Sequence, residues 1–143
     1  MTTSVAQLLK TPSRELDAMF AAAEAGPIPE GQADGTAIIA PGTVFSAEIA
    51  KMINIFAWQG KVFDPKAGVL RNRIGALGLN AIVAKVYKGP SWLDGKDCIV
   101  IDYSETSLVA HWIRDEIRLI QPGLYLGEVY WEKSRLIHFC LEV

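Results

Sequence analysis

The chain has 143 residues, of which 50% are hydrophobic and 21% are charged, a composition typical of a folded domain and not of a disordered segment. Its formal net charge of −2 argues against a nucleic-acid-binding protein, because contacts to phosphates require a surplus of lysine and arginine. No apolar run reaches the ~20 residues that a membrane-spanning helix needs.

The length suits one domain, 1–143, which can bury roughly two-thirds of its unfolded surface. The first residues lack the basic stretch followed by a long apolar stretch that marks a secretion signal. We therefore expect a cytoplasmic protein in which Cys98 and Cys140 stay reduced, each as a small core residue.

Two helices are expected in the first part of the chain. The segment 12–25 consists of strong helix formers, Thr11 can cap its first turn, and Pro12 suits the first helical position. A short strand within "GTAIIAPG" (35–42) follows the turn "GPIPEG". The segment 46–58 is expected to be the second helix, because its apolar residues recur at helical spacing.

From residue 60 to residue 143 the pattern changes to short β-rich runs separated by turn residues. The Asp94-Gly95 pair is a hairpin signal, and the polar "EKS" turn near the C-terminus predicts another hairpin. These runs favour an antiparallel meander over parallel βαβ units. The predicted strands are "GKVFD", "VLRNRI", "NAIVAKVYK", "DCIVIDYS", "GLYLGEVYW" and "RLIHFCLEV".

The predicted fold is mainly β within the α+β class: an antiparallel meander with two N-terminal helices that plug one end or cover one face. Six or more antiparallel strands must protect their edges, and closure into a small lipocalin-like barrel removes those edges. The alternative is a strongly bent open sheet with the helices packed into its concave side. A barrel of about eight strands either fills with side chains or holds one small ligand.

The segment 108–120 is ambiguous because its apolar residues fit both a helix and a strand. We expect it to be mainly extended, with at most a helical turn near its start, because it is rich in β-branched residues and lies between strands. The helix-friendly stretch "RDEIR" opposes this interpretation. If the segment is extended, Arg114 and Arg118 belong to a charged row on one face, whereas His111 and Asp115 face the apolar side.

Two stretches, "FAWQGKVFD" (56–64) and "CIVIDYSETSLVAHWIRDEIRLIQPGLYLG" (98–127), resemble bacterial and fungal proteins that join a GXWXG domain to a C-terminal domain of unknown function. The residues that match the pattern of those proteins are Trp58, Gly60, Lys61, Phe63, Asp102, Arg114 and Gly127. The GXWXG signature itself is absent, because "EGQADGTAIIAPGT" stands in its place. The resemblance implies a compact, β-rich, ligand-holding domain and transfers no mechanism.

Recognisable catalytic and cofactor-binding motifs are missing, including the phosphate-binding G-x-x-x-x-G-K-[ST] loop, the dinucleotide-binding G-x-G-x-x-G turn and the H-E-x-x-H zinc motif. The chain has two histidines, His111 and His138, and no acidic cluster at ligand spacing. We therefore expect no cofactor and no dedicated metal site. His138 is interpreted as a hydrogen-bonded strand residue.

Paired arginines are candidates for ligand binding. Arg114 and Arg118 share a face whether their segment is helix or strand, and two guanidinium groups side by side can clamp a carboxylate or a phosphate. Arg73 belongs to an "RNR" stretch in which it points the same way as Arg71. The alternative interpretation is that these arginines are solvated surface residues paired with neighbouring acids.

Carboxylates and tyrosines are the candidates for acid–base chemistry. Asp102 ends an apolar strand, and Asp115 lies among apolar residues if its segment is extended. A partly buried carboxylate without a partner has a raised pKa, as a general acid or base requires. Tyr103 or Tyr125 would then donate the proton, and an arginine would hold the charge that develops.

Two functions fit these observations. The first is a non-enzymatic protein whose barrel holds a hydrophobic or amphiphilic molecule, such as a fatty-acid-like or aromatic carboxylate. The second is a small isomerase, cyclase or hydrolase that acts on an apolar substrate in the same cavity. A homodimer with Trp112 and Trp131 at its interface is a third hypothesis. The candidate ligand-binding residues are Trp58, Lys61, Arg73, Trp112, Arg114, Arg118 and Tyr125.

Overall fold

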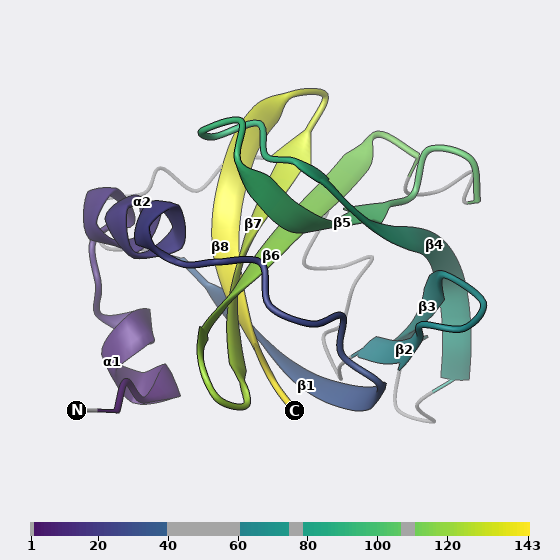
Figure 1. Ribbon diagram of the computed structural model, residues 1–143, viewed down its shortest axis with the longest axis horizontal. Coiled ribbons are helices and arrows are strands. Elements are labelled where there is room, and N and C mark those ends of the chain that lie inside the picture. The colour runs from purple at the N-terminus through teal and green to yellow at the C-terminus, as the bar shows by residue number, and fades with distance from the viewer. Residues whose placement is uncertain (1, 40–60, 75–78, 107–110) are drawn as a thin grey trace.

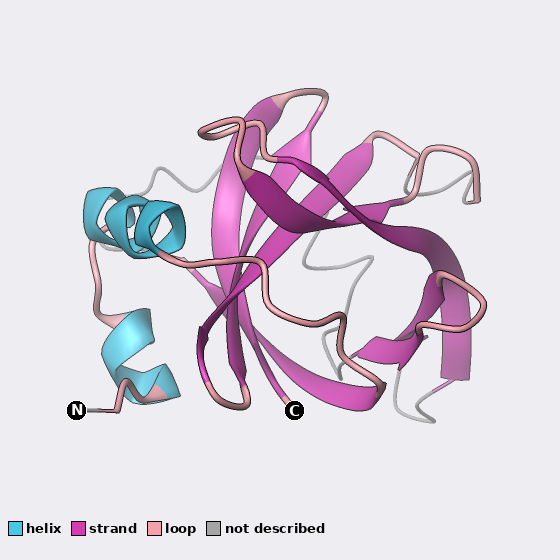
Figure 2. Ribbon diagram, viewed as in Figure 1, coloured by secondary structure: helices cyan, strands magenta, loops and turns pink. Residues whose placement is uncertain are grey.

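The computed structural model describes residues 2–39, 61–74, 79–106 and 111–143, with side chains for all of these except 72–74 and 79–82. Eight strands within these residues form a closed antiparallel barrel in which sequence neighbours pair (Figures 1 and 2). The strands are β1 (Gly31–Ile38), β2 (Lys61–Asp64), β3 (Val69–Ile74), β4 (Leu79–Pro90), β5 (Asp97–Asp102), β6 (Ile113–Gln121), β7 (Leu124–Trp131) and β8 (Ser134–Glu142).

The barrel closes through β1, which pairs with two strands. Residues 31–33 of β1 pair with β2, and residues 34–38 pair with β8. Every strand of the described sheet therefore has a partner on both sides, which is how a barrel avoids edge-to-edge association. The predicted meander is confirmed, and it takes the form of a barrel rather than an open bent sheet.

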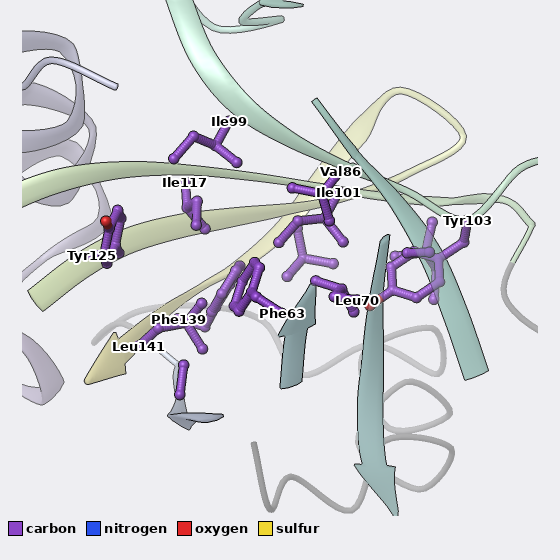
Figure 3. Close-up of a cluster of buried hydrophobic side chains, with 14 of the residues drawn as sticks. Phe63, Leu70, Val86, Ile99, Ile101, Tyr103, Ile117, Tyr125, Phe139 and Leu141 are labelled. Atoms are coloured by element: carbon purple, nitrogen blue, oxygen red, sulfur yellow. The ribbon is translucent and has the colours of Figure 1, made fainter. Parts of the chain in front are cut away.

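Alternate residues of the strands point into the barrel and form its main hydrophobic core. Figure 3 shows this cluster, with Phe63 and Phe139 near its centre and Tyr103 and Tyr125 at opposite ends. The buried aliphatic members include Leu70, Val86, Ile99, Ile101, Ile113, Ile117, Val129, Ile137 and Leu141. The strands that carry them are among those that the sequence predicts from its β-rich runs.

Helices α1 (Val5–Leu9) and α2 (Ser13–Ala22) cover part of the outer side of the barrel (Figure 1). Leu8, Leu16 and Phe20 from these helices join outward residues of β5, β7 and β8 in a second hydrophobic cluster. The expected helix that the structure describes, α2, therefore covers a face of the barrel, one of the two arrangements that the sequence suggests.

The expected helix 12–25 is confirmed as α2, although α2 ends earlier, at Ala22. Sequence reasoning misses α1, because five residues are too few to show a helical period. The signal that marks α1 is its capping box, in which Ser4 and Gln7 bond each other's backbone. The expected helix 46–58 lies outside the described residues. No helix in the described part of the chain is long and apolar enough to cross a membrane.

The ambiguous segment is extended where the structure describes it, as β6. His111 lies in a turn before the strand, so it does not share the strand's inward face, and residues 107–110 lie outside the described part. Asp115 is buried on the inward face, whereas Arg114 and Arg118 point outward. The prediction of an extended segment is therefore confirmed for β6.

A close contact inside the barrel requires a glycine in β7. Gly127 pairs with Phe139 of β8, and the Phe139 ring packs against the glycine backbone. A Cβ atom at position 127 would overlap ring atoms of Phe139, which is fully buried. The aromatic ring therefore occupies space that only glycine leaves.

Gly127→Ala is expected to lower the free energy of unfolding by about 2 kcal/mol, because overpacking a core forces side chains out of their preferred rotamers. Gly89→Ala is the matched control: its Cβ would make only ordinary contacts, so stability should hold. Urea denaturation of both variants and the unsubstituted protein measures the difference. Equal stability of all three proteins would show that the ring moves aside without cost.

Candidate functional site

Three polar side chains meet inside the otherwise apolar barrel: Lys61, Tyr103 and Asp115. The side chain of each residue points into the barrel, among the core residues. Lys61, for example, lies on the same inward face of its strand as Phe63. Lys61 begins β2, Tyr103 directly follows β5, and Asp115 lies in β6. Because β2 stands across the barrel from β5 and β6 in the closed strand order, the lysine reaches over the interior.

The three groups make direct polar contacts. The Lys61 ammonium donates to the Tyr103 hydroxyl over 3.0 Å, and its Nζ lies 3.4 Å from Asp115 Oδ2. The Lys61 and Asp115 side chains are only 1% and 3% exposed, so the ion pair is shielded from water. Lys61 Nζ also lies 5.9 Å from the centre of the Phe139 ring, a cation–π distance.

Burial acts on the two ionisable partners in opposite directions. It raises the pKa of Asp115, although the Lys61 charge and hydrogen bonds from Lys61 and Tyr103 oppose the rise. Burial lowers the pKa of Lys61, and Asp115 opposes the fall. The proton affinities of the carboxylate and the amine therefore approach one another, which suits groups that give or take a proton.

The energetics of such a pair point to function rather than to stability. Taking each charge out of water costs on the order of several kcal/mol, and replacing a buried ion pair by apolar side chains is often neutral or stabilising. Aliphatic side chains fill much of the interior around Lys61 and Asp115, so an apolar pair would serve the fold equally well. We therefore take Lys61, Tyr103 and Asp115 as the candidate site, called the interior triad below.

Sequence analysis identifies each member of the interior triad as a candidate but does not predict that they meet. Lys61 comes from β2, across the barrel from β5 and β6, and the three residues are far apart in sequence, so no local pattern contains them. Two further ligand-binding candidates remain predictions: Trp58 lies outside the described residues, and so does the side chain of Arg73.

The other two acid–base candidates lie apart from the interior triad. Asp102 accepts hydrogen bonds from the Ser104 amide at 2.9 Å and the Tyr87 hydroxyl at 3.0 Å. Burial opposes these bonds, yet they hold the pKa of Asp102 below its usual value. Tyr125 donates to the Pro27 carbonyl at 2.5 Å, and it lies at the other end of the interior cluster from the triad (Figure 3).

Arg118 is fully buried on the outer side of the barrel, where the protein itself uses all of its donors. It donates to both carboxylate oxygens of Asp94, each over 2.7 Å. Its other hydrogen bonds go to the backbone oxygens of Phe20, Lys96 and Asp97. No N–H of Arg118 is left for a ligand, and the side chain instead fastens the loop between β4 and β5 to α2.

Arg114 and Trp112 also lie outside the barrel interior. Arg114 donates to Glu116 over 3.1 Å, and its guanidinium lies 4.4 Å from the centre of the Trp92 ring. Trp112 is 46% exposed and stacks against Trp131, with 6.1 Å between the ring centres. These residues form an aromatic and charged surface at the start of β6 and do not line the interior triad.

A second buried polar cluster lies outside the barrel wall, against α2. Asp17 of α2, Glu128 of β7 and His138 of β8 bring ligand atoms within 4.8 Å of one another, and they are the one group of metal-ligating side chains with this geometry in the described part of the chain. Their distance in sequence hides the cluster from motif analysis, which expects no metal site. The His138 ring does make the expected hydrogen bond, to Asp17 at 2.8 Å.

Comparison with solved structures shows the same fold in a protein from Thermomonospora curvata, known by its crystal structure. The two superpose with a TM-score of 0.65 over 93% of this chain and 88% of the other, at 15% sequence identity. At such identity the likeness concerns the fold alone. No protein-family model and no curated protein matches the sequence. The resemblance to GXWXG-domain proteins therefore stays a prediction.

Asp94→Asn is expected to lower the free energy of unfolding by about 1.5 kcal/mol at pH 7, because Arg118 loses the carboxylate charge and one of its two acceptor oxygens. Hydrogen bonds from Arg118 lower the pKa of Asp94 from its ordinary value of 3.8 to about 2. This stabilisation is therefore complete above about pH 4 and is lost as the pH falls toward 2. Denaturant titrations should show the two proteins converging over that range.

Asp34→Asn, at an exposed position of β1, serves as the control and should match the unsubstituted protein at every pH. A deficit of the Asp94→Asn protein that stays constant between neutral and acidic pH would show that the charge of Asp94 does not carry the stabilisation.

Proposed function

We propose that this protein binds a small, largely apolar molecule inside its barrel and that Lys61 and Tyr103 hold the polar group of that molecule. The supporting observation is the interior triad, in which an amine, a phenol and a carboxylate converge among aliphatic and aromatic side chains. Small-molecule sites typically combine apolar walls with a few convergent polar groups. Barrels of about eight strands are wide enough for one such ligand.

The charges of the triad favour a ligand that carries a carbonyl or a hydroxyl group. Asp115 already neutralises Lys61, and a free carboxylate next to Asp115 would place two negative charges together. A carbonyl oxygen accepts a hydrogen bond from the Lys61 ammonium without adding charge. The arginine pair from which the sequence suggests a carboxylate ligand points away from the interior, so it lends that ligand no support.

The same triad supports a second candidate function, an acid–base enzyme. General acids and bases work best when their pKa values lie near the operating pH, and burial shifts the pKa values of Asp115 and Lys61 toward one another. In this case Asp115 takes a proton from the carbon next to a substrate carbonyl, and the Lys61 ammonium stabilises the developing oxyanion. Exchange of that proton for deuterium in heavy water would distinguish an enzyme from a binding protein.

Displacement of a neutral fluorescent probe, N-phenyl-1-naphthylamine, by 2-decanone, 1-decanol and decanoate tests the binding proposal. We expect the ketone and the alcohol to bind more tightly than decanoate. Lys61→Met should weaken ketone binding about 10-fold, which corresponds to one hydrogen bond from a charged donor at ~1.4 kcal/mol. Native mass spectrometry of freshly purified protein should reveal a bound molecule of this class.

Lys85→Met is the matched control, because Lys85 is an exposed lysine that pairs with Glu105. This variant should bind the ketone as the unsubstituted protein does. Unchanged affinity in Lys61→Met, or no binding of any of the three compounds, would refute the proposal.

The Lys61–Asp115 pair gives a separate prediction about stability. Lys61→Met alone should lower the free energy of unfolding by about 3–5 kcal/mol, because it leaves a buried carboxylate without its counter-ion. Lys61→Met with Asp115→Leu should recover most of that loss, since an apolar pair replaces both charges. The double variant also provides a folded protein without the triad for the binding assay. If its instability instead equals the sum of the two single changes, the pair stabilises the barrel.

A further inference from the structure

Asp17 of α2 meets Glu128 of β7 and His138 of β8, and α2 lies on the outer side of the barrel (Figure 1). Asp17 Oδ1 lies 2.8 Å from His138 Nε2, and Glu128 Oε1 lies 3.5 Å from the same nitrogen. Glu128 and His138 are buried, and their sequence neighbours on β7 and β8 belong to the interior core. The barrel wall therefore separates this cluster from the interior triad.

One oxygen of this cluster has no hydrogen bond. Glu128 Oε2 accepts from the Tyr130 hydroxyl at 2.9 Å, but Glu128 Oε1 has no hydrogen-bond partner although its side chain is fully buried. A buried, charged acceptor without a donor is strongly destabilising. Such atoms in native proteins require an explanation, of which an ion is one. The orphaned oxygen faces His138 Nε2, so it points into the cluster.

The cluster also brings two carboxylates to a single arginine. The Arg135 guanidinium contacts the Asp17 carboxylate, lies 3.7 Å from Glu128 Oε1 and donates to Ser13 Oγ over 3.1 Å. Two carboxylates therefore share one guanidinium. A cation next to His138 Nε2 would lie between the two carboxylates and give Glu128 Oε1 a partner.

We propose that this cluster binds a divalent transition-metal ion, best matched by Zn²⁺, through His138 Nε2 and one carboxylate oxygen each from Asp17 and Glu128. An imidazole nitrogen and carboxylate oxygens are ligands that Zn²⁺ accepts, and three protein ligands leave a fourth position for water. Tetrahedral ligands ~2.0 Å from zinc lie about 3.3 Å apart. The two separations of 2.8 and 3.5 Å at His138 Nε2 lie on either side of that value.

The ion enters from the side of Asp17, whose side chain is 26% exposed. It replaces Arg135 at the Asp17 carboxylate, and Arg135 keeps Ser13 as its acceptor. Because Asp17 belongs to α2 and the other two ligands belong to barrel strands, the ion fastens the helix to the barrel. Its role is structural, so binding stabilises the folded chain by mass action.

Isothermal titration calorimetry of chelator-treated protein with zinc chloride tests the site. We expect one Zn²⁺ per chain and a rise of several degrees in the midpoint of thermal unfolding at saturating zinc. Mg²⁺ at the same concentration should have little effect, because it prefers oxygen ligands. Co²⁺ in place of zinc should produce the visible absorption bands of a bound ion.

The chain has two histidines, so His111 supplies the matched control. His138→Gln and Glu128→Gln should each reduce the affinity for Zn²⁺ at least about 10-fold, whereas His111→Gln should retain it. In the unsubstituted protein, zinc should shift the imidazole NMR resonances of His138 and leave those of His111 in place. The NMR measurement does not depend on the folding of any variant.

The absence of both binding heat and NMR shifts at about 100 μM zinc would overturn the proposal and leave the cluster as an ion-pair network only. Shifts confined to His111, or zinc binding that survives His138→Gln unchanged, would overturn it as well. Neither result bears on the interior triad, because the two sites share no residue.

Discussion

The buried polar sites of this protein depend on which residues of each barrel strand point inward and which point outward. Successive side chains of a barrel strand point alternately inward and outward. A shift of one residue along β6 would move Asp115 out of the interior and bring in Arg114 or Glu116. Because β6 is paired on both sides, its neighbours prevent that shift. The interior triad and the cluster against α2 exist because the closed barrel fixes the register of its strands, and with it the inward or outward direction of each side chain.

The two buried polar clusters differ in how their charges are balanced. Lys61 and Asp115 neutralise each other inside the barrel, whereas Asp17 and Glu128 outnumber Arg135 on its outer side. Neither arrangement stabilises the fold as well as packed apolar side chains would. The balanced pair suits a neutral polar ligand, and two carboxylates beside one guanidinium and an imidazole suit a cation. The barrel wall thus separates a site in which a lysine and an aspartate are paired from a site in which two carboxylates share one guanidinium.

Local patterns predict much of this fold. The spacing of β-rich runs and turns predicts the meander, and the alternation in β6 predicts that Asp115 faces inward, because each signal lies within one element. Pairings across the chain leave no local signal: His138 and Asp17 are 121 residues apart. Arg118 is a ligand-binding candidate in the sequence because nothing nearby reveals that Asp94 and the end of α2 take up its donors.

The ladder between β1 and β8 has a consequence for how the protein is made. The other ladders of the barrel join strands that are neighbours in sequence, whereas this one joins positions as distant as Asp34 and Glu142. Contacts of such long range form late, because they close a large loop. A nascent chain can pair β1 through β7 on the ribosome, but its sheet keeps two open edges until β8 emerges. A chain that lacks β8 therefore exposes two strand edges that can pair with other chains.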